Sequence, residues 1–499
     1  VIIDARDATI QGSIAGTSEV WLHNSQSGAG LLTAHSGSSV TCSGCALRMS
    51  LSGSNVSLEG SITTATVEIK SLQSISHTGT LTVSGVALTI AVDTASIAGT
   101  VKCTGAACSI LVSANATLQL RGSLSCTIGK CSVSLLSGGD LNTTASMSCA
   151  GNSQCLVDIA SRSSALLGGS IAGSDIRMLV AGSLQIQGSV STSGQGYTES
   201  SGDGKGSRTT TSGYSTSFRV SGSGAGHGGN GANGCYRYSS GQLPTGGGSY
   251  GSSSDPRTFG SGGGRGCYYY GSCTSQYGAG GRGGGRIYMN ASTIEIASGA
   301  TVSADGTQGA TSSGYVGGGG GSGGSILMEA CNVSGGGIVR ASGGDSVLGS
   351  GAGGGGRISL KAGFISSELT VIVSGGATSS GYLCSGFDGT FNVSFGLNTS
   401  VFNWLFRQHL LRSFLYQNLP VPNGSSSFAI IDHSFAWPQN ARNFTQLPVL
   451  RRSRTSCGLC PLHSYVNETI PPVLVLGEMT PAYGSHLFNV SYCRCNLGY

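Results

Sequence analysis

Ile10-Gln11-Gly12-Ser13-Ile14 is the stretch that decides the fold, because the chain repeats it at a regular spacing. The motif is an aliphatic residue, a variable residue, glycine, a small hydroxyl residue and a second aliphatic residue. Up to residue 190 its central position recurs every 19–25 residues, at Gly12, Gly37, Gly60, Gly79, Gly99, Gly122, Ala145, Gly169 and Gly188. A sustained period of this size predicts a solenoid, in which each repeat forms one coil.

Short β-type runs lie between the copies of this motif. Val67-Glu68-Ile69 and Leu118-Gln119-Leu120 alternate with period two and are bounded by Gly, Ser and Asn, with no apolar stripe of helical period. Such short strands bury an apolar face only when coils stack on each other. The pattern therefore predicts a parallel β-helix with the aliphatic residues inside and the Ser/Thr residues outside. A β-sandwich is the alternative, but it would not keep one motif in register nine times.

Composition divides the chain into five segments. We expect a short-coil β-helix at 1–190, a Gly/Ser/Tyr-rich loop insertion at 191–284, and a long-coil, glycine-rich β-helix at 285–400. The glycine runs of the long coils are either closely packed corner insertions or disordered loops. Residues 401–455 are expected to be a cap or docking segment with an amphipathic helix at 401–419. Cys457-Gly-Leu-Cys460-Pro461 and Cys493-Arg-Cys495-Asn-Leu-Gly498-Tyr499 resemble parts of an EGF-like cysteine-rich module, so we expect such a module at 456–499 and expect it to continue in a longer precursor.

Bulk composition excludes several classes of protein. Only 9% of the residues are charged, and the net charge of +5 is spread over 499 residues, so no basic nucleic-acid-binding patch is predicted. The 86 glycines follow no Gly-X-Y period, which excludes collagen. No run of 18 apolar residues predicts a transmembrane helix. The start at Val1, without Met or a signal peptide, is interpreted as the start of a mature chain.

Sequons and cysteines indicate an extracellular protein. Eleven Asn-x-Ser/Thr sequons are candidate N-glycosylation sites, at Asn55, Asn115, Asn142, Asn290, Asn332, Asn392, Asn398, Asn423, Asn443, Asn467 and Asn489. The candidate disulfide residues are Cys42, Cys45, Cys103, Cys108, Cys126, Cys131, Cys149, Cys155, Cys235, Cys267, Cys273, Cys457, Cys460, Cys493 and Cys495. Their number and close pairing suit an oxidising compartment.

The cysteines follow the period of the coils. Cys103, Cys126 and Cys149 are 23 residues apart, and each is followed closely by a second cysteine. This spacing favours local disulfides that close a turn, while bonds between adjacent coils remain the alternative. Cys42-x-x-Cys45 could also be a redox or zinc motif, but no second pair follows at zinc-finger spacing. We therefore predict no metal site.

No catalytic constellation is evident. No two of the 21 acidic residues are adjacent, whereas β-helix polysaccharide enzymes need clustered carboxylates. Gly226-His227-Gly228 is similar to a polygalacturonase motif, but the paired aspartates are missing. We predict no enzyme and no cofactor. Arg451, Arg452 and Arg454 form either a basic processing site or an exposed basic loop.

One part of the chain resembles known proteins. The glycine-rich cadence at 319–328, 341–344 and 353–360 resembles the β-helix repeats of secreted plant and protist surface proteins. Among them, mastigoneme-type filament proteins combine such repeats with EGF-like modules. The resemblance covers about 285–376 and implies an extracellular filament protein.

These observations predict a secreted, glycosylated structural protein. We expect a subunit of an extracellular filament or surface coat, whose partners are copies of itself or homologous subunits. One alternative is an adhesin that binds carbohydrate through Tyr236, Tyr238 and Tyr268 of the 191–284 loop. A polysaccharide-active β-helix enzyme is the third.

Overall fold

The computed structural model describes most of residues 2–394 and two short strands near the C-terminus. The gaps are residues 5–6, 17–18, 24–30, 52–53, 72, 128, 150–154, 208–217, 236–242, 270–276, 313–315 and 379–383. The described residues contain strands and no helix, so the predicted all-β class is confirmed. The expected helix at 401–419 lies outside the described residues.

The chain divides into two compact units. The first comprises Val1–Leu397 with Met479–Leu487, and the second comprises Asn398–Glu478 with Phe488–Tyr499. In the second unit, β35 (Ser464–Val466) pairs antiparallel with β36 (Cys493–Cys495). The remainder of the expected cap and of the EGF-like module lies outside the described residues.

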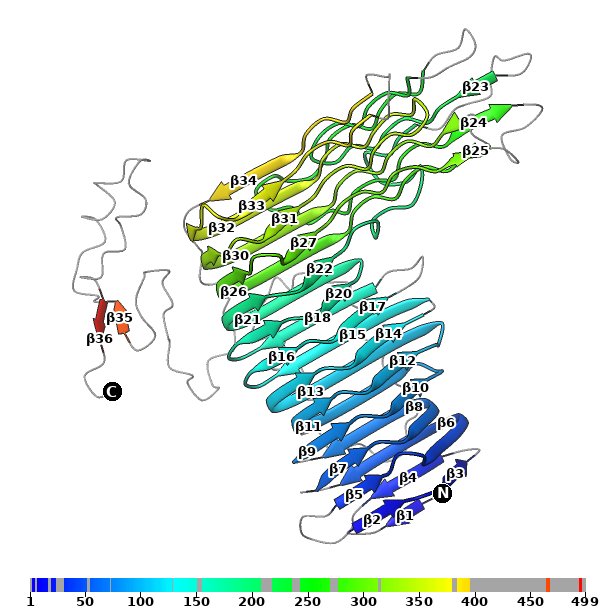
Figure 1. Cartoon of the computed structure of the whole chain (residues 1–499), viewed down its shortest axis with the longest axis vertical. Helices are drawn as coiled ribbons and strands as arrows, with labels where there is room; N and C mark the ends of the chain where they lie inside the picture. Colours follow the sequence, from blue (N-terminus) through cyan, green and yellow to red (C-terminus); the bar gives the residue numbers. More distant parts are fainter. Residues whose placement is uncertain are drawn as a thin grey trace, which may run out of the picture. The chain divides into compact units, whose positions relative to one another are not determined.

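The first unit is a parallel β-helix with three sheets (Figure 1). The strands of the first sheet are, in order, β1 (Ile2–Asp4), β4 (Glu19–His23), β6 (Ser39–Leu51), β8 (Ser61–Ser71), β11 (Ala87–Ile97), β13 (Ala107–Leu120), β15 (Lys130–Ser137), β18 (Cys155–Ser161), β21 (Asp175–Ile186), β26 (Arg286–Ile296), β30 (Ser325–Ser334), β32 (Arg357–Ile365) and β34 (Thr390–Ser394). Every pair in this ladder is parallel, as stacked coils require.

The second and third sheets form the other sides of the coils. The second contains β2 (Asp7–Ile10), β5 (Leu31–Ala34), β7 (Asn55–Leu58), β9 (Ser74–His77), β16 (Leu141–Thr143) and β19 (Ala165–Leu167), with the later halves of β11, β13, β21, β26, β30 and β32. The third contains β3 (Ser13–Gly16), the first halves of β6 and β8, β10 (Thr80–Val83), β12 (Thr100–Cys103), β14 (Ser123–Cys126), β17 (Ser146–Cys149), β20 (Ser170–Ala172), β22 (Ser189–Ser191), β27 (Thr301–Ser303), β31 (Ile338–Arg340) and β33 (Thr370–Ile372).

The repeated motif leads into the third sheet, and its copies stack. Thr100 of β12 pairs with Ser123 of β14, so Gly99 lies directly below Gly122. A β-carbon on Gly122 would collide with the carbonyl oxygen of Gly99, which accepts a hydrogen bond from the Ser123 amide. Close approach of the next coil therefore explains the glycine. The flanking aliphatic residues point inward as predicted; for example, Leu120 and Leu124 are buried.

For the motif copy centred on Gly37, the predicted central position is wrong by one residue. Ser13 pairs with Ser39, which puts Ser38, and not Gly37, above Gly12. Gly37 instead has a φ of 87°, a turn conformation that glycine adopts readily. The residues around Gly37 match the motif only loosely, so the sequence does not reveal this one-residue shift.

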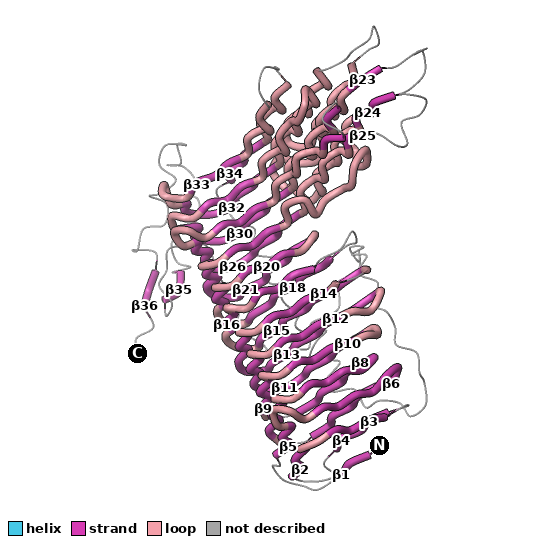
Figure 2. Tube along the Cα trace, turned by 45° about the vertical axis from the view of Figure 1, so that its right-hand side comes forward, coloured by secondary structure: helices cyan, strands magenta, loops and turns pink. Residues whose placement is uncertain are grey.

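The glycine-rich segments pack together into one bundle beside the coils (Figure 2). Residues 317–324 lie at its centre. Successive N–H groups donate in turn to the backbone carbonyls of three neighbouring segments. Residues 318, 321 and 324 donate to residues 304–310, and residues 319 and 322 donate to residues 261–264. Residues 320 and 323 donate to residues 351–354. The carbonyl groups of residues 317 and 319–324 accept from residues 222–227, 281–284, 344 and 357. This period of three is that of a polyproline II helix, here surrounded by backbone neighbours.

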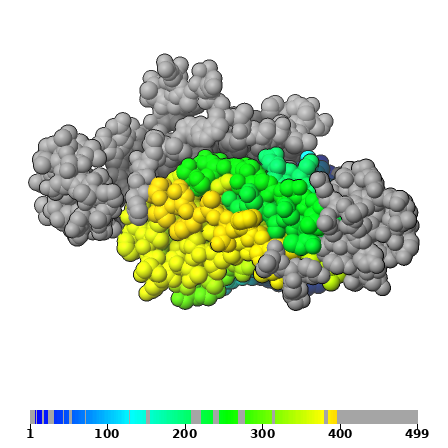
Figure 3. Space-filling model, turned by 90° about the horizontal axis from the view of Figure 1, so that it is seen from above, coloured from blue at the N-terminus to red at the C-terminus, as the bar shows by residue number. Residues whose placement is uncertain are grey.

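This bundle explains the glycine runs. A β-carbon on Gly319 or Gly321 would collide with the backbone of a neighbouring segment. The packed alternative is therefore correct for these described residues, and they are not loose loops. The described part of the 191–284 insertion, which lies between β22 and β26 in the chain, shares the bundle with the insertions of the long coils (Figure 3).

Short antiparallel strands occur at the edge of the bundle. β23 (Phe218–Val220), β24 (Gly266–Tyr269) and β25 (Tyr277–Gly278) form one small sheet. β28 (Thr311–Ser312) and β29 (Val316–Gly317) form another.

Candidate functional site

A cluster of polar side chains lies on the outer surface of the first sheet, where three long coils meet. Asn290 of β26 pairs with Glu329 of β30, which pairs with Lys361 of β32. Strand alternation points these side chains outward, because their neighbours Met289, Met328 and Leu360 are buried in the core. With Tyr288 and Asp255, these residues form what we call the Glu329 cluster.

Glu329 is the centre of this cluster. Its Oε2 accepts hydrogen bonds from Tyr288 Oη at 2.8 Å and from Asn290 Nδ2 at 3.0 Å. Its Oε1 pairs with Lys361 Nζ at 2.9 Å. Burial is the main reason why the pKa of Tyr288 is raised. The phenol therefore stays protonated and donates to the carboxylate.

Residues 251–260 cross the same sheet surface and are held by its side chains. Their backbone carbonyls accept from outward donors on three coils: Arg286 Nη1 to Arg257 O, Ser325 Oγ to Thr258 O, and Ser359 Oγ to Ser254 O. Asp255 lies 3.8 Å from Lys361 Nζ, and Arg257 stacks over the ring of Tyr288. The 251–260 segment therefore provides hydrogen-bond acceptors for outward side chains of the sheet that would otherwise face solvent.

The Glu329 cluster was missed by the sequence analysis. Asp255 and Glu329 are far apart in the sequence, yet both lie near Lys361. Only the stacking of coils brings such residues together. The sequence does contain one signal for this cluster. Asn290, Glu329 and Lys361 occupy equivalent positions in three successive coils, each directly after an apolar core residue.

A second ion-pair cluster lies lower on the same sheet. Asp175 of β21 is buried and pairs with Arg177 at 2.8 Å and with Arg286 at 2.6 Å. Arg286 also stacks over Phe259. These contacts fasten residues 257–259 to the coils, which is a structural role.

His227, from the Gly-His-Gly motif, is buried inside the glycine bundle. Its Nδ1 bonds to Gly323 O at 2.8 Å, and since a carbonyl only accepts, this nitrogen carries the proton. Its Nε2 then accepts from Thr258 Oγ1, also at 2.8 Å. Burial lowers the pKa of His227 to about 4. The histidine is therefore neutral near pH 7 and joins residues 317–324 of the bundle to the 251–260 segment.

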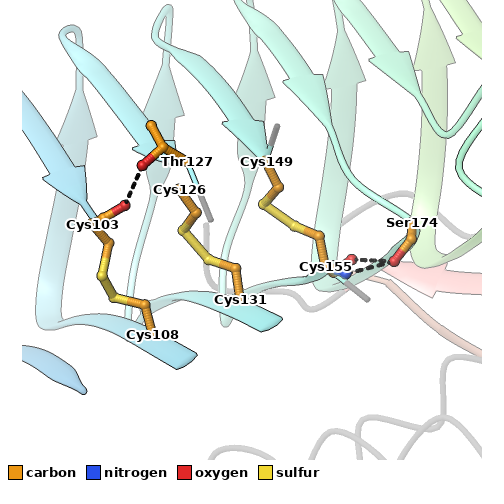
Figure 4. Close-up of a disulfide and its surroundings, with 8 residues drawn as sticks. All are labelled: Cys103, Cys108, Cys126, Thr127, Cys131, Cys149, Cys155 and Ser174. Atoms are coloured by element: carbon orange, nitrogen blue, oxygen red, sulfur yellow. Dashed lines mark hydrogen bonds between the residues drawn. A yellow bond between two sulfur atoms is a disulfide. The ribbon is translucent and has the colours of Figure 1, made fainter. Parts of the chain in front are cut away.

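Four local disulfides are present: Cys42–Cys45, Cys103–Cys108, Cys126–Cys131 and Cys149–Cys155. The last three stack in register on neighbouring coils (Figure 4). The sulfur atoms of Cys126, Cys131 and Cys149 lie within 4.8 Å of one another, but all are used in these disulfides. Thiolate ligands for a metal are therefore not available in the oxidised protein.

A fifth disulfide was not predicted. Cys235 pairs with Cys384, 149 residues away, and Cys384 was not among the candidates. Cys331, also omitted, and Cys267 are disulfide-bonded too. Cys273, Cys457 and Cys460 lie outside the described residues, and the side chains of Cys493 and Cys495 are not described. The long-range pair has no local spacing signal, because it depends on the packing of the bundle.

The sequons differ in exposure. Asn55 and Asn142 are exposed, Asn115, Asn332 and Asn392 are partly buried, and Asn290 is buried. The other five sequons lie outside the described residues, as do Arg451, Arg452, Arg454, Tyr236 and Tyr238. Tyr268 lies in β24, and its side chain is not described. Carbohydrate binding through these tyrosines stays a prediction.

The charged side chains of these two clusters on the first sheet form ion pairs with one another. In the Glu329 cluster and around Asp175, acidic groups are paired with lysine or arginine, and both clusters connect coils to the 251–260 segment.

A scan against protein-family models gives no match for this chain, and searches of curated proteins and of solved structures also find none. Within the described residues there is no helix capable of spanning a membrane.

Proposed function

We propose that this chain is a secreted structural glycoprotein that acts as a subunit of an extracellular filament or surface coat. The observation that carries the proposal is the outer surface of the third sheet. From β3 to β22 the first outward position of every strand bears a hydroxyl, at Ser13, Ser39, Ser61, Thr80, Thr100, Ser123, Ser146, Ser170 and Ser189.

The second outward position extends this hydroxyl surface. It is occupied by Thr41, Thr63, Thr82, Ser125, Ser148 and Ser191, with two alanines and one charged residue, Lys102. Hydroxyls of adjacent coils bond to each other, as Ser13 does with Ser39 at 2.9 Å. Such a surface carries little charge, so a second copy meets little electrostatic repulsion.

The size of this surface favours repeated contacts over an isolated dimer. Nine strands at about 4.8 Å and four residues at about 3.3 Å give a footprint of about 570 Å² per copy. A pair would bury about 1,100 Å², just below the roughly 1,200–2,000 Å² of stable specific interfaces. Many such contacts in one assembly would reinforce each other through high effective concentration.

Rigidity also supports the proposal. The ladder of parallel coils, the stacked disulfides and the glycine bundle leave few ways for the described part to bend. Disulfides of this kind persist in oxidising compartments. A stiff subunit with a regular side suits a filament or coat.

A glycan introduced on the third sheet tests the proposal. Thr82→Asn creates a new sequon with the following Val83 and Ser84, and the matched control T82N/S84A carries the same asparagine without the sequon. All proteins are secreted from a glycosylating host and compared by light scattering and negative-stain microscopy. We expect wild type and control to assemble as concentration rises, and the glycan-bearing variant to stay dispersed.

Two results would contradict this proposal. Wild-type protein that remains monomeric at high concentration is not a self-assembling subunit. Assembly of the glycan-bearing variant to the wild-type extent shows that the third sheet is not the contact surface.

A further inference from the structure

The sheets of the β-helix differ in their sequons. Asn55 of β7 and Asn142 of β16 lie on the second sheet, and both side chains are exposed. The ladder from β7 to β16 passes through β9, β11 and β13, which places the two residues about 19 Å apart along the coil axis. The described strands of the third sheet contain no asparagine.

Asn142 is well placed for modification. It occupies the outward position between Leu141 and Thr143, whose side chains are buried in the core. At Asn55, the amide oxygen accepts a hydrogen bond from Ser74 of the next coil. An N-linked glycan is attached through the amide nitrogen, so this bond is compatible with a glycan.

Asn290 has the opposite environment. It is 5% exposed, and its Nδ2 donates to both Tyr288 Oη at 3.2 Å and Glu329 Oε2 at 3.0 Å. An amide nitrogen has two hydrogens, and glycosylation replaces one of them. A glycan here would remove one of these bonds and place a sugar inside the Glu329 cluster. The sequon hydroxyl of Ser292 is also engaged, since it donates to Ala181 O.

We propose that the folded protein carries N-glycans at Asn55 and Asn142 and none at Asn290. The glycans mark the second sheet as a solvent-facing side and leave the third sheet bare. This inference rests on the proposed function only in requiring passage through the secretory pathway. It gives a physical reason why lateral contacts would use one side of the coils.

Site mapping on secreted wild-type protein tests this inference. The monodisperse fraction is treated with peptide-N-glycosidase F in ¹⁸O-water, and peptides are sequenced by mass spectrometry. We expect ¹⁸O-labelled aspartate at positions 55 and 142, and unmodified asparagine at 290. Ser57→Ala and Thr144→Ala each remove one exposed sequon, and each should lower the intact mass by one glycan.

Occupancy at Asn290 in this folded fraction would overturn the inference, and so would unmodified asparagine at both 55 and 142. Ser292→Ala provides a second measurement, because it removes the sequon and should leave the glycan mass unchanged. Failure of the proposed function is distinguishable. A protein with this glycan pattern that does not assemble refutes the filament subunit and leaves the glycan assignment intact.

Discussion

At the residue scale, one column of glycines sets the distance between coils. Gly79, Gly99 and Gly122 stack above one another, and each would collide with the carbonyl below if it carried a β-carbon. Ala145 occupies the same column, and there the ladder hydrogen bond from Ser146 N to Gly122 O is 3.3 Å, against 2.9–3.2 Å at Gly79, Gly99 and Gly122. The coil that carries Ala145 thus accommodates a methyl group with a ladder bond at the long end of the range.

Substitution within this column is the first prediction. Gly122→Ala should lower the free energy of unfolding by about 1–3 kcal/mol, because the methyl group overpacks the contact with Gly99. Gly12→Ala is the matched control, since a β-carbon there meets nothing within 4 Å, and it should change stability by about 0.5 kcal/mol at most. Urea denaturation followed by circular dichroism measures both. Equal effects of the two substitutions would refute the close-approach explanation.

The buried His227 makes stability depend on pH. Its folded pKa is lowered to about 4 from the ordinary 6.5, so between these values the unfolded chain binds more protons. Stability should therefore fall as pH decreases from about 6.5 to about 4. The full effect is about 3 kcal/mol, at about 1.4 kcal/mol per pH unit.

The measurement is the urea midpoint from pH 4 to 7 for wild type and His227→Asn. His77 is also buried with a lowered pKa, so the variant should keep a weaker slope of the same sign. Identical slopes in both proteins would show that His227 is not the titrating group.

At the element scale, disulfides act over very different distances. Cys126 and Cys131 close a turn with a sequence separation of 5, whereas Cys235 and Cys384 close a loop with a separation of 149. In the chain-entropy account, the longer loop restricts the unfolded chain more. The predicted short pairs and the unpredicted long pair should thus contribute unequally.

Removal of each pair tests this difference. C126A/C131A should cost about 2 kcal/mol and C235A/C384A about 5 kcal/mol of unfolding free energy. Both substitutions are to alanine, so the packing change is similar in kind. Chemical denaturation under non-reducing conditions gives the two values, and a larger loss for the short pair would contradict the expectation.

At the scale of the whole first unit, residues 318–324 at the centre of the glycine bundle belong to no regular strand, yet their amides are all hydrogen-bonded. The amides of residues 318–324 donate in rotation to three different segments of the chain. Hydrogen exchange followed by mass spectrometry should show protection of these amides comparable to that of strand β26. Exchange within seconds would instead indicate a loose loop.

The sequence predicts those features of the structure that depend on residues close together in the chain. The motif around Gly12, the inward aliphatic residues and the local cysteine pairs are all properties of a single coil, and one coil is contiguous in sequence. Repetition then specifies the parallel stack. The all-β class and the β-helix were therefore predictable.

Only the tertiary structure decided what depends on segments from different coils. The six neighbours of residues 317–324, the Cys235–Cys384 bond and the cluster around Glu329 join residues far apart in the chain. Glycine runs are compatible with both a loose loop and a packed bundle, because a residue without a side chain carries no pattern of its own. Their backbone groups find partners only after the coils have stacked, and that contact separates the two outcomes.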